Sequence, residues 1–352
     1  MSDAGREQVV SQDRRRSAWR LIWTICAVAL RVVLLATLAI CAASPELIHL
    51  DWRFDIVASL LAQVCLVGCV VSIWQAAFGR WVWCAAFAVV TAGGFSWMLG
   101  VERAPTAGSA ATGTGVSVLV MNVHSRNDRD EAIFTVIDGA DADLVVIVES
   151  SWKIIRTLPA HPPLLERYPY RDGADANSSG QIIVLSKHPL TRSNDNGASP
   201  GLASSWGYRA GYVDLGGERI RFAAVHAPSP RTRATWGYGQ HTFTRLAQHF
   251  ERIGGPMDSR SEPTIVAGDL NSSPTGVRSR LVTENLGLRR AKPVRVWDGT
   301  YPASLPWFAR SSIDGAFVSQ GISVRSWTTV RVPGSDHRGV LVSLDIEAIP
   351  GD

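Results

Sequence analysis

The pattern of apolar and polar positions divides the chain into two parts that meet near residue 100. Before that point three runs, 20–43, 55–78 and 81–99, are apolar on every side. Each is long enough to cross a bilayer, which takes about 20 residues, and tryptophans stand near the ends of the runs, as they do at membrane interfaces. Buried core helices of a soluble domain are the alternative, since they too can be apolar on every side, but the tryptophans near the ends of the runs favour a membrane. We therefore predict about three transmembrane helices.

Charged residues around the first run leave a second interpretation open and set the orientation. Arg14, Arg15 and Arg16 precede a run that closes with "CAAS", as in a secretory signal peptide, although two further spans would keep the product in the membrane. Arg31 lies within the run, where a charge costs about 2.5–3.5 kcal/mol, so it snorkels, faces another span or shows that the span starts later. The basic flank and the net acidic loop after the run predict a cytoplasmic N-terminus and, after three crossings, an extracytoplasmic second part.

After residue 100 the pattern changes to short β-rich runs bounded by turn residues. "VSVLVMNV", "DLVVIVES", "RIRFAAVHA" and "TIVAGDL" have the length of strands, and helical patterns interrupt the strands near 130–139, 237–252 and 276–285. Between the two parts, the segment 101–115 is rich in Ala, Gly and Thr, which predicts a flexible linker. The second part is therefore expected to be a mixed α and β domain.

Composition and charge narrow the picture further. The 352 residues, of which 46% are hydrophobic, suffice for one large domain beside the anchor. All five cysteines precede residue 100, so the second part tolerates an oxidising compartment without disulfides. The net charge is +4, and the first 100 residues hold eight Arg against six Asp plus Glu, which leaves +2 for the remainder. Such a domain lacks the strongly basic surface of a dedicated duplex-binding protein.

The candidate chemistry lies at the ends of the predicted strands. Groups that can bind metal or phosphate stand there in the order Asn122, Glu149, His226, Asp269 with Asn271, Asp314, and Asp336 with His337. Each alone has a simple explanation as a turn cap, a surface carboxylate or a structural histidine. In "TIVAGDLNSSPTG", however, an apolar strand delivers a carboxylate and an amide side by side. The joint order of these groups predicts a site.

These motifs also carry a resemblance to a known family. With "MNV", "ADLVVIVES", "SGQIIVLSKHPL", "AAVHAPSP", "VAGDLNSSP", "SIDGAFV" and "GSDHRGV" in this order, residues 116–346 resemble the endonuclease/exonuclease/phosphatase superfamily, which has the DNase I-like fold. The anchor resembles that of a membrane-anchored bacterial subgroup. The resemblance implies an α/β (α+β) fold: a four-layer sandwich of two packed mixed β-sheets flanked by helices, preceded by about three transmembrane helices. The implied domains are an anchor over 1–100, a flexible linker over 101–115 and a catalytic domain over 116–352.

A metal site follows from the resemblance. Hydrolysis of a phosphate ester requires charge neutralisation on the phosphoryl oxygens, which a hard divalent cation supplies. By resemblance the metal ligands are Asn122, Glu149 and Asp336. The implied cofactor is Mg²⁺, with Mn²⁺ or Ca²⁺ as alternatives. Because Mg²⁺ prefers oxygen ligands and keeps several waters, one or two carboxylates suffice.

The resemblance likewise implies catalytic roles for His226, Asp269, Asn271, Asp314 and His337. Asp269 would orient or deprotonate the attacking water. His337 would contact the phosphoryl group or transfer a proton, with Asp314 fixing its tautomer. Asn271 and His226 would bind phosphate oxygens. Arg209 on the preceding strand is a further phosphate-binding candidate, and a solvated strand arginine is the alternative for it.

Together these features predict a membrane-anchored, extracytoplasmic, metal-dependent phosphoesterase in the cell membrane. It would hydrolyse a phosphodiester, either a phospholipid or glycolipid head group or a nucleic acid, by metal-assisted attack of water. The tether favours lipid head groups, because it raises their effective concentration. The loop 302–308, "PASLPWF", would dip into lipid, stack on a base or pack. A catalytically inactive ligand-binding relative is the alternative function. The expected partners are the lipid bilayer and the substrate, with no obligate protein partner.

Overall fold

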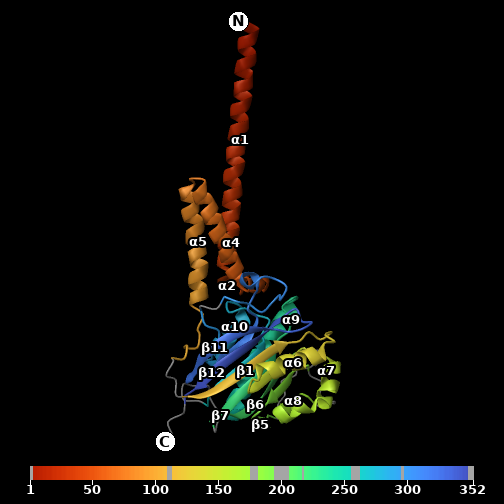
Figure 1. The fold of residues 1–352 in the computed structure, drawn as a ribbon. Coiled ribbons are helices and arrows are strands. Elements are labelled where there is room, and N and C mark those ends of the chain that lie inside the picture. Colours follow the sequence, from red (N-terminus) through yellow and green to blue (C-terminus); the bar gives the residue numbers. More distant parts are fainter. Residues whose placement is uncertain are drawn as a thin grey trace.

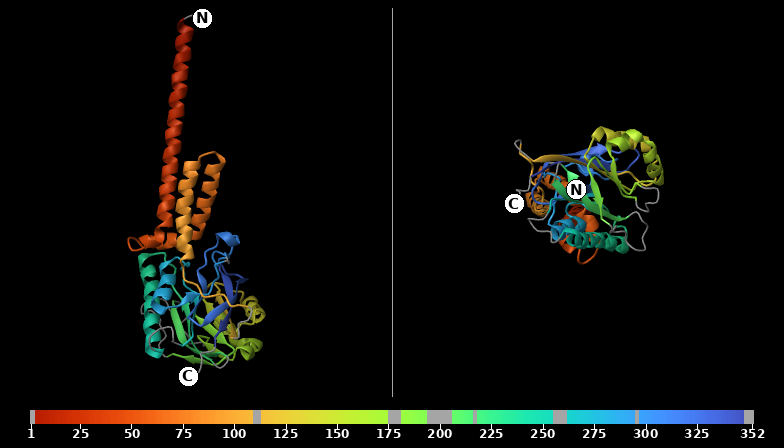
Figure 2. Two further views of the ribbon diagram at one scale, coloured as in Figure 1. Left: turned by 90° about the vertical axis from the view of Figure 1, so that its left-hand side faces the viewer. Right: turned by 90° about the horizontal axis from the view of Figure 1, so that it is seen from below.

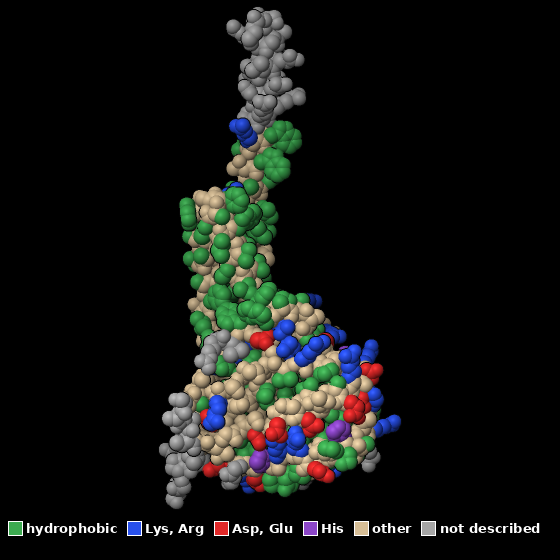
Figure 3. All heavy atoms as spheres, in the orientation of Figure 1, with side chains coloured by type: hydrophobic (Ala, Val, Ile, Leu, Met, Phe, Trp, Pro, Cys, Tyr) green, Lys and Arg blue, Asp and Glu red, His purple; other side chains and the backbone are tan. Residues whose placement is uncertain are grey.

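A stalk of helices stands on one end of a β-rich body (Figures 1 and 2). The computed structural model describes residues 3–108, 113–174, 181–193, 206–215, 218–254, 262–294 and 297–347, with side chains from residue 19 onward. Hydrophobic side chains cover the stalk, whereas charged side chains gather on the body (Figure 3). The change in residue pattern near residue 100 therefore corresponds to a change from one part of the structure to the other.

The stalk contains α1 (Asp3–Ala42), α4 (Leu61–Ala77) and α5 (Trp81–Leu99), with α2 (Ser44–Leu47) and α3 (Arg53–Ala58) at its base. Two segments, Trp19–Ala42 and Trp81–Leu99, are long and apolar enough to cross a membrane. The expected span over 55–78 is instead broken between α3 and α4. Since α4 has 17 residues, its length is about 26 Å against a hydrocarbon core of about 30 Å. The structure therefore does not confirm a third spanning helix.

The stalk helices are held together by close packing and by polar contacts. A Cβ added at Gly68 of α4 would lie 2.2 Å from Thr91 Oγ1 of α5, so only glycine permits this approach. On α1, Arg31 Nε donates to Gln75 Oε1 of α4 at 3.3 Å, and its Nη1 donates to Ala27 O at 3.1 Å. Of the three explanations for Arg31, the structure supports the one in which it faces a neighbouring helix.

The body contains two six-stranded sheets with the strand orders β11-β12-β1-β2-β4-β3 and β5-β6-β7-β8-β10-β9. The first consists of β1 (Thr114–Asn122), β2 (Leu144–Val148), β3 (Tyr170–Asp172), β4 (Ile183–Ser186), β11 (Ile322–Arg331) and β12 (Arg338–Ile346). The second consists of β5 (Leu190–Arg192), β6 (Gly207–Leu215), β7 (Glu218–His226), β8 (Thr264–Asp269), β9 (Arg289–Arg290) and β10 (Asp314–Val318). Because β1 and β2 are parallel in the first sheet, as are β7 and β8 in the second, while other neighbours are antiparallel, both sheets are mixed.

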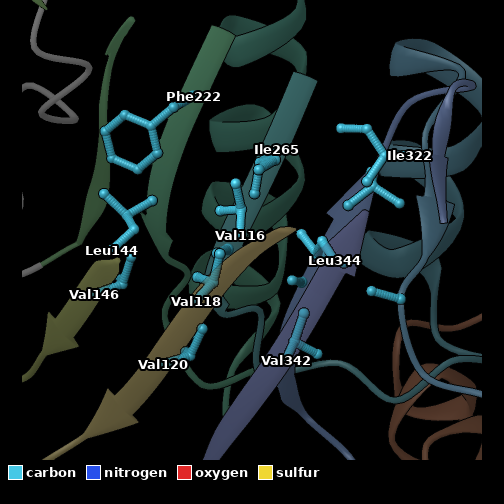
Figure 4. Packing of buried hydrophobic residues seen from close by; sticks show 14 of the residues in the cluster. Val116, Val118, Val120, Leu144, Val146, Phe222, Ile265, Ile322, Val342 and Leu344 are labelled. Carbon is cyan, nitrogen blue, oxygen red and sulfur yellow. The ribbon is translucent and has the colours of Figure 1, made fainter. Parts of the chain in front are cut away.

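The two sheets pack face to face and are covered by helices on the outside. Alternate residues of β1, Val116, Val118 and Val120, point into the core between the sheets, where Phe222 and Ile265 also lie (Figure 4). The first sheet is covered by α6 (Asp130–Ala140), α7 (Trp152–Thr157), η1 (Leu158–Ala160) and α8 (Pro162–Arg167), and the second by α9 (Arg233–Gly254) and α10 (Val277–Leu286). The predicted four-layer sandwich is confirmed.

Specific hydrogen bonds join the stalk to the body. Asp55 of α3 is buried and accepts hydrogen bonds from Val277 N at 2.8 Å and Trp236 Nε1 at 3.0 Å. Both views place the base of the stalk beside α9 and α10 (Figures 1 and 2). Asp55 therefore belongs to this contact, which explains why the apolar run around it is not one continuous span.

Part of the segment between anchor and body is also paired with the sheets. Ala104 N donates to Arg290 O at 2.9 Å, and Ala107 N donates to Val324 O at 2.8 Å. Residues that we expected in a flexible linker thus form backbone bonds to β9 and β11. The domain boundaries themselves stay a prediction.

Candidate active site

Strand pairing brings the predicted site residues to one end of the sandwich. In the first sheet β1 ends at Asn122 beside the end of the parallel strand β2, and Glu149 follows β2 directly. In the second sheet His226 is in register with Asp269 across the parallel pair β7 and β8, and Asp314 opens β10 opposite Asp269. The strands form because their residues are apolar and β-branched, and the polar groups follow where each strand stops.

The backbone around Asp269 and Glu149 adopts conformations that few residues tolerate. Gly268 has φ +152°, and a Cβ there would lie 1.8 Å from Val225 O, so the parallel strands can approach only at a glycine. Asn271 (φ 48°) and Glu149 (φ 54°) are left-handed non-glycine residues. Such conformations cost on the order of 1–3 kcal/mol each and concentrate at functional sites.

Asn122 links the two sheets at the site. Its Nδ2 donates to Glu149 Oε1 and to Asp269 Oδ2, each at 2.9 Å. His226 Nε2 lies 3.6 Å from Glu149 Oε1. Burial raises the pKa of Glu149, but the interactions with His226 and Asn122 outweigh burial and lower the pKa to about 2. Glu149 is therefore ionised at neutral pH, as a metal ligand must be.

Asp269 is fully buried and has a different electrostatic environment. Burial, followed by the charge of Asp314, raises the pKa of Asp269 to about 6, against the opposing effects of His337 and His226. Asn271 N donates to Asp269 Oδ1 at 2.7 Å and orients the carboxylate. A carboxyl group with a pKa near neutrality can exchange a proton with a bound water.

His337 and Asp314 form a buried pair beside Asp269. His337 Nδ1 lies 2.9 Å from Asp314 Oδ2 and 3.9 Å from Asp269 Oδ2. Burial lowers the pKa of His337, but the charge and hydrogen bond of Asp314 outweigh burial and raise the pKa to about 10. Asp314 Oδ1 is buried without a hydrogen-bond partner among the described residues. Asp314 thus fixes the orientation of a charged imidazole.

Two overlapping groups of side chains have the spacing of metal ligands. One consists of Glu149, His226 and Asp269, the other of Asp269, Asp314 and His337, and in each the ligand atoms lie within 4.8 Å of one another. Carboxylate oxygens suit Mg²⁺, Mn²⁺ and Ca²⁺, and the Glu149 carboxylate is partly open to solvent. The residues present therefore fit a divalent cation beside Glu149.

Of the remaining predicted residues, Asp336 lies at the rim of the site, and Asn271 lies beside Asp269, to whose Oδ2 its Nδ2 donates at 3.3 Å. Asp336 is half exposed, and its Oδ1 is 3.7 Å from His124 Nδ1, which in turn is 3.9 Å from Glu149 Oε2. Asn271 Nδ2 donates to Ala227 O at 2.9 Å.

Arg209 has a buried structural environment. Its Nη1 donates to Asp172 Oδ1 at 2.9 Å, and its Nε donates to Ile182 O at 2.8 Å. These contacts do not bring the guanidinium to Glu149, Asp269 or His337. The expectation of a solvated strand arginine is wrong, because Arg209 is buried. The phosphate contact predicted for Arg209 finds no support in these hydrogen bonds.

Two site neighbours had no predicted role. His124 stands between Glu149 and Asp336, and the ring centroid of Tyr301 lies 4.8 Å from that of His337. His124 follows Asn122 by two positions and has φ 64°, so the turn after β1 aims it at Glu149. Proximity to the "MNV" motif was the available signal for His124. Tyr301 lies in a loop, and strand-end reasoning could not place it.

The loop after Tyr301 presents apolar side chains to the surface. Leu305, Trp307 and Phe308 are 41%, 56% and 49% exposed. Trp307 opens the short 3₁₀ helix η2 (Trp307–Ala309) and contacts Phe308 edge to face. Of the three roles considered for the loop, packing inside the body does not explain these side chains.

Comparison with known proteins gives a family and a fold. Residues 119–337 match the sequence profile of the Endonuclease/Exonuclease/phosphatase family. Curated protein sequences give no match. The endonuclease/exonuclease/phosphatase from Bacteroides vulgatus is similar in structure, with 17% identity, a TM-score of 0.50 and coverage of 66% of this chain and 100% of that chain. D. rerio TDP2 complexed with single strand DNA product has 14% identity, a TM-score of 0.50 and coverage of 66% and 99%. At such identities the likeness shows the fold alone.

Proposed function

The chain belongs to the Endonuclease/Exonuclease/phosphatase family, and on that premise we propose that it is a membrane-anchored, divalent-metal-dependent phosphodiesterase. One observation carries the proposal. Asn122 hydrogen-bonds both the ionised Glu149 and the buried Asp269, while the Asp314–His337 pair lies against the same Asp269. A candidate metal ligand, a candidate base and a charged imidazole thus meet at one point, as hydrolysis of a phosphate ester requires.

The proposed metal ligands are Glu149 and Asn122, with Asp336 contributing from the rim. The cofactor is Mg²⁺, or Mn²⁺ or Ca²⁺ in its place. When bound, the cation supplies charge neutralisation for the phosphoryl oxygens and the leaving oxygen. Glu149 holds the charge needed for this without a change in protonation, because its pKa is about 2.

The proposed proton transfers are carried out by the chain's own carboxyl and imidazole groups. Asp269 orients the attacking water and accepts its proton, for which a pKa of about 6 is suitable at neutral pH. Asp314 holds Nδ1 of His337 and leaves the opposite ring nitrogen to contact the phosphoryl group. Asn271 and His226 contact phosphate oxygens. Burial of Asp269, Asp314 and His337 limits competition by bulk water.

The proposed location is the cell membrane, with a cytoplasmic N-terminus and the site outside. The apolar surface of the stalk supports insertion (Figure 3), and so does the exposure of Trp19 and Trp23 near the start of the first apolar segment. The arginines before Trp19 support a cytoplasmic N-terminus, and a site outside further requires that α4 crosses the membrane between the two longer segments. The proposed domains remain an anchor over 1–100, a linking segment over 101–115 and a catalytic domain over 116–352.

The proposed substrate is a phosphodiester, either a lipid head group or a nucleic acid. Attachment to the stalk keeps the site near the membrane, and the exposed Trp307 and Phe308 lie on the loop that also carries Tyr301 of the site. These features favour a lipid head group. Aromatic rings can equally stack on bases, which keeps single-stranded nucleic acid as the competing substrate.

A substrate panel tests the proposal. Purified full-length protein in detergent is assayed for release of phosphate or head group from DNA, RNA, phospholipids and soluble phosphomonoesters, with Mg²⁺ and with chelator. Metal-dependent cleavage of at least one phosphodiester is expected. Cleavage that survives chelation would contradict the metal role, and absence of cleavage across the panel would contradict the enzymatic assignment.

A further inference from the structure

A cavity of about 110 Å³ lies between the base of the stalk and the body. On its stalk side the end of α5 contributes an apolar wall of Phe95, Met98 and Leu99, beside the polar side chains of Ser59 and Gln63. Trp297 of the body closes it, with its ring 6.1 Å from that of Phe95. The cavity has room for several waters, at about 10–15 Å³ each, or for a group of comparable total size. None of the proposed catalytic residues lines it.

The body side of this cavity is cationic, since Arg103, Arg290, Lys292 and Arg310 line it and no described lining residue is Asp or Glu. Arg310 Nη1 pairs with Asp298 Oδ1 at 3.0 Å. Lys292 donates to the backbone oxygen of Asp298, and its Nζ lies 4.8 Å from the ring centroid of Trp327. Arg310 is therefore the lining cation that forms a salt bridge within the described part of the chain, although the charge of Asp298 also acts on Lys292 and that of Asp314 on Arg290.

Arg103 and Arg290 lie next to each other and have neutral partners. The segment around Arg103 pairs with β9 at Arg290, through the bond from Ala104 N to Arg290 O. Arg103 Nη1 donates to Val101 O at 2.7 Å, and Arg290 Nη2 donates to Ser312 O at 2.7 Å. Arg290 is 2% exposed, and its Nε has no hydrogen-bond partner among the described residues. A donor of a buried guanidinium is thus left unsatisfied.

The cations around this cavity destabilise one another. Burial, followed by the charge of Arg290, lowers the pKa of Lys292 to about 7. Burial, followed by the charge of Arg103, lowers the pKa of Arg290 to about 9. Buried charges are costly unless they are paired, and one anion in the cavity would satisfy three cations together.

We propose that this cavity binds the phosphate group of an anionic membrane phospholipid. The proposal rests on the proposed insertion of the stalk, because α5 ends at Leu99, where a spanning helix meets the phosphate layer of the bilayer. The phosphate contacts Arg103, Arg290 and Lys292, and the acyl chains lie along the apolar end of α5. Arginine and lysine side chains at the end of a transmembrane helix attract anionic lipid head groups through their charge. Inorganic phosphate shares the charge but leaves the apolar wall without a partner.

The test uses full-length protein purified in an uncharged detergent and stripped of lipid. Melting temperature and bound mass by native mass spectrometry are measured with dioleoylphosphatidylglycerol, dioleoylphosphatidylcholine and inorganic phosphate. Phosphatidylglycerol should bind and raise the melting temperature, and the other two should do so only at much higher concentration. At about fivefold per cation, the double variant Arg103→Gln/Lys292→Gln should bind phosphatidylglycerol about 25-fold more weakly.

Control variants distinguish an effect of lost charge on lipid binding from an effect of impaired folding. Arg103→Lys/Lys292→Arg keeps both charges and should keep most of the affinity. Arg171→Gln removes an exposed arginine of β3, at the opposite edge of the first sheet from β11, and should change nothing. Equal binding of phosphatidylcholine, an equal response to inorganic phosphate, or full affinity in the double Gln variant would each overturn the proposal.

Two further readouts distinguish this proposal from the proposed function. Hydrolysis of a soluble phosphodiester by the Arg103→Gln/Lys292→Gln variant should equal that of the wild type, because neither residue is in the site. If lipid binding fails while hydrolysis persists, the proposed lipid site is refuted and the proposed phosphodiesterase activity is not. If the wild-type protein is extracted from membranes by alkaline carbonate, the anchor proposal is wrong, and with it the bilayer source of the lipid.

Discussion

The pair Asp314–His337 allows a quantitative test of the site. His337 Nδ1 is 2.9 Å from Asp314 Oδ2. The pKa of His337 is raised from its ordinary value of 6.5 to about 10, which at about 1.36 kcal/mol per pKa unit sets an upper limit of about 5 kcal/mol on the stabilisation of the charged ring. Asp314→Asn keeps the shape of the side chain, removes the largest part of this stabilisation while Asp269 and Asp336 keep theirs, and permits the wrong tautomer.

The expected losses follow from these roles. His337→Ala should reduce turnover by about 10²–10⁴, the usual range for a group in proton transfer. Asp314→Asn should lose about 10² or more, because it acts through His337. The double variant should be about as slow as His337→Ala alone, since groups acting as a unit are not additive.

The assay is hydrolysis of a soluble phosphodiester with Mg²⁺, with the melting temperature measured on the same preparations. Asp172→Asn serves as a matched control, because it breaks a buried ion pair with Arg209 outside the site. This control should lower the melting temperature and leave the rate per folded molecule unchanged. Multiplicative losses in the Asp314→Asn/His337→Ala variant would refute the coupling of the two residues. Unchanged rates in the single variants would show that the pair has only a structural role.

Three further predictions address metal, pH and topology. Glu149→Gln should lower activity by at least about 100-fold and weaken Mg²⁺ binding in calorimetry, and full activity with Mg²⁺ would remove Glu149 from the site. Because the folded pKa of His337 is raised to about 10, its stabilising effect is complete below about pH 6.5 and is lost as the pH rises through about 10. The difference in melting temperature between wild type and His337→Ala should shrink over that range, and a constant difference would contradict the raised pKa. A reporter that is active only outside the cytoplasm, fused after residue 352, should be active, whereas a signal only from a cytoplasmic reporter would reverse the orientation.

The body was predictable because its local signals agree with its tertiary structure. The apolar strand 264–268 leads directly to Asp269, and parallel pairing with β7 brings His226 beside it. The expected helices near 130–139, 237–252 and 276–285 correspond to α6, α9 and α10. Strand-end positions could therefore be converted into spatial neighbours without knowledge of the side-chain contacts.

The junction between stalk and body was not predictable from local pattern. Asp55 looks like a tolerated charge at the edge of an apolar run, yet it accepts hydrogen bonds from Val277 and Trp236 of the body. Composition likewise predicted a flexible linker where Ala104 and Ala107 form backbone bonds with the sheets. Composition cannot predict the backbone pairing of small residues, because this pairing depends on which sheet edge lies near the segment in the folded protein.

Within the site, the missed residues are those that a loop positions. Tyr301 reaches His337 through the loop after Gly299, and His124 reaches Glu149 through a left-handed turn. Arg209 was predicted to bind phosphate because of its position on a strand. In the structure its guanidinium instead donates to Asp172. The contacts of such side chains depend on elements that are distant in the sequence, so local sequence patterns do not predict them.

The most direct test of the central claim compares wild type and Asp269→Asn in hydrolysis of one phosphodiester, with Mg²⁺ and after chelation. Asp269 is the residue that both candidate ligand groups share, and asparagine keeps its size while removing its ability to accept a proton. The account predicts turnover by the wild type with Mg²⁺, its loss on chelation, and a rate at least about 100-fold lower in the variant at a similar melting temperature. Wild-type turnover that is independent of metal, or an Asp269→Asn variant as fast as the wild type, would contradict it.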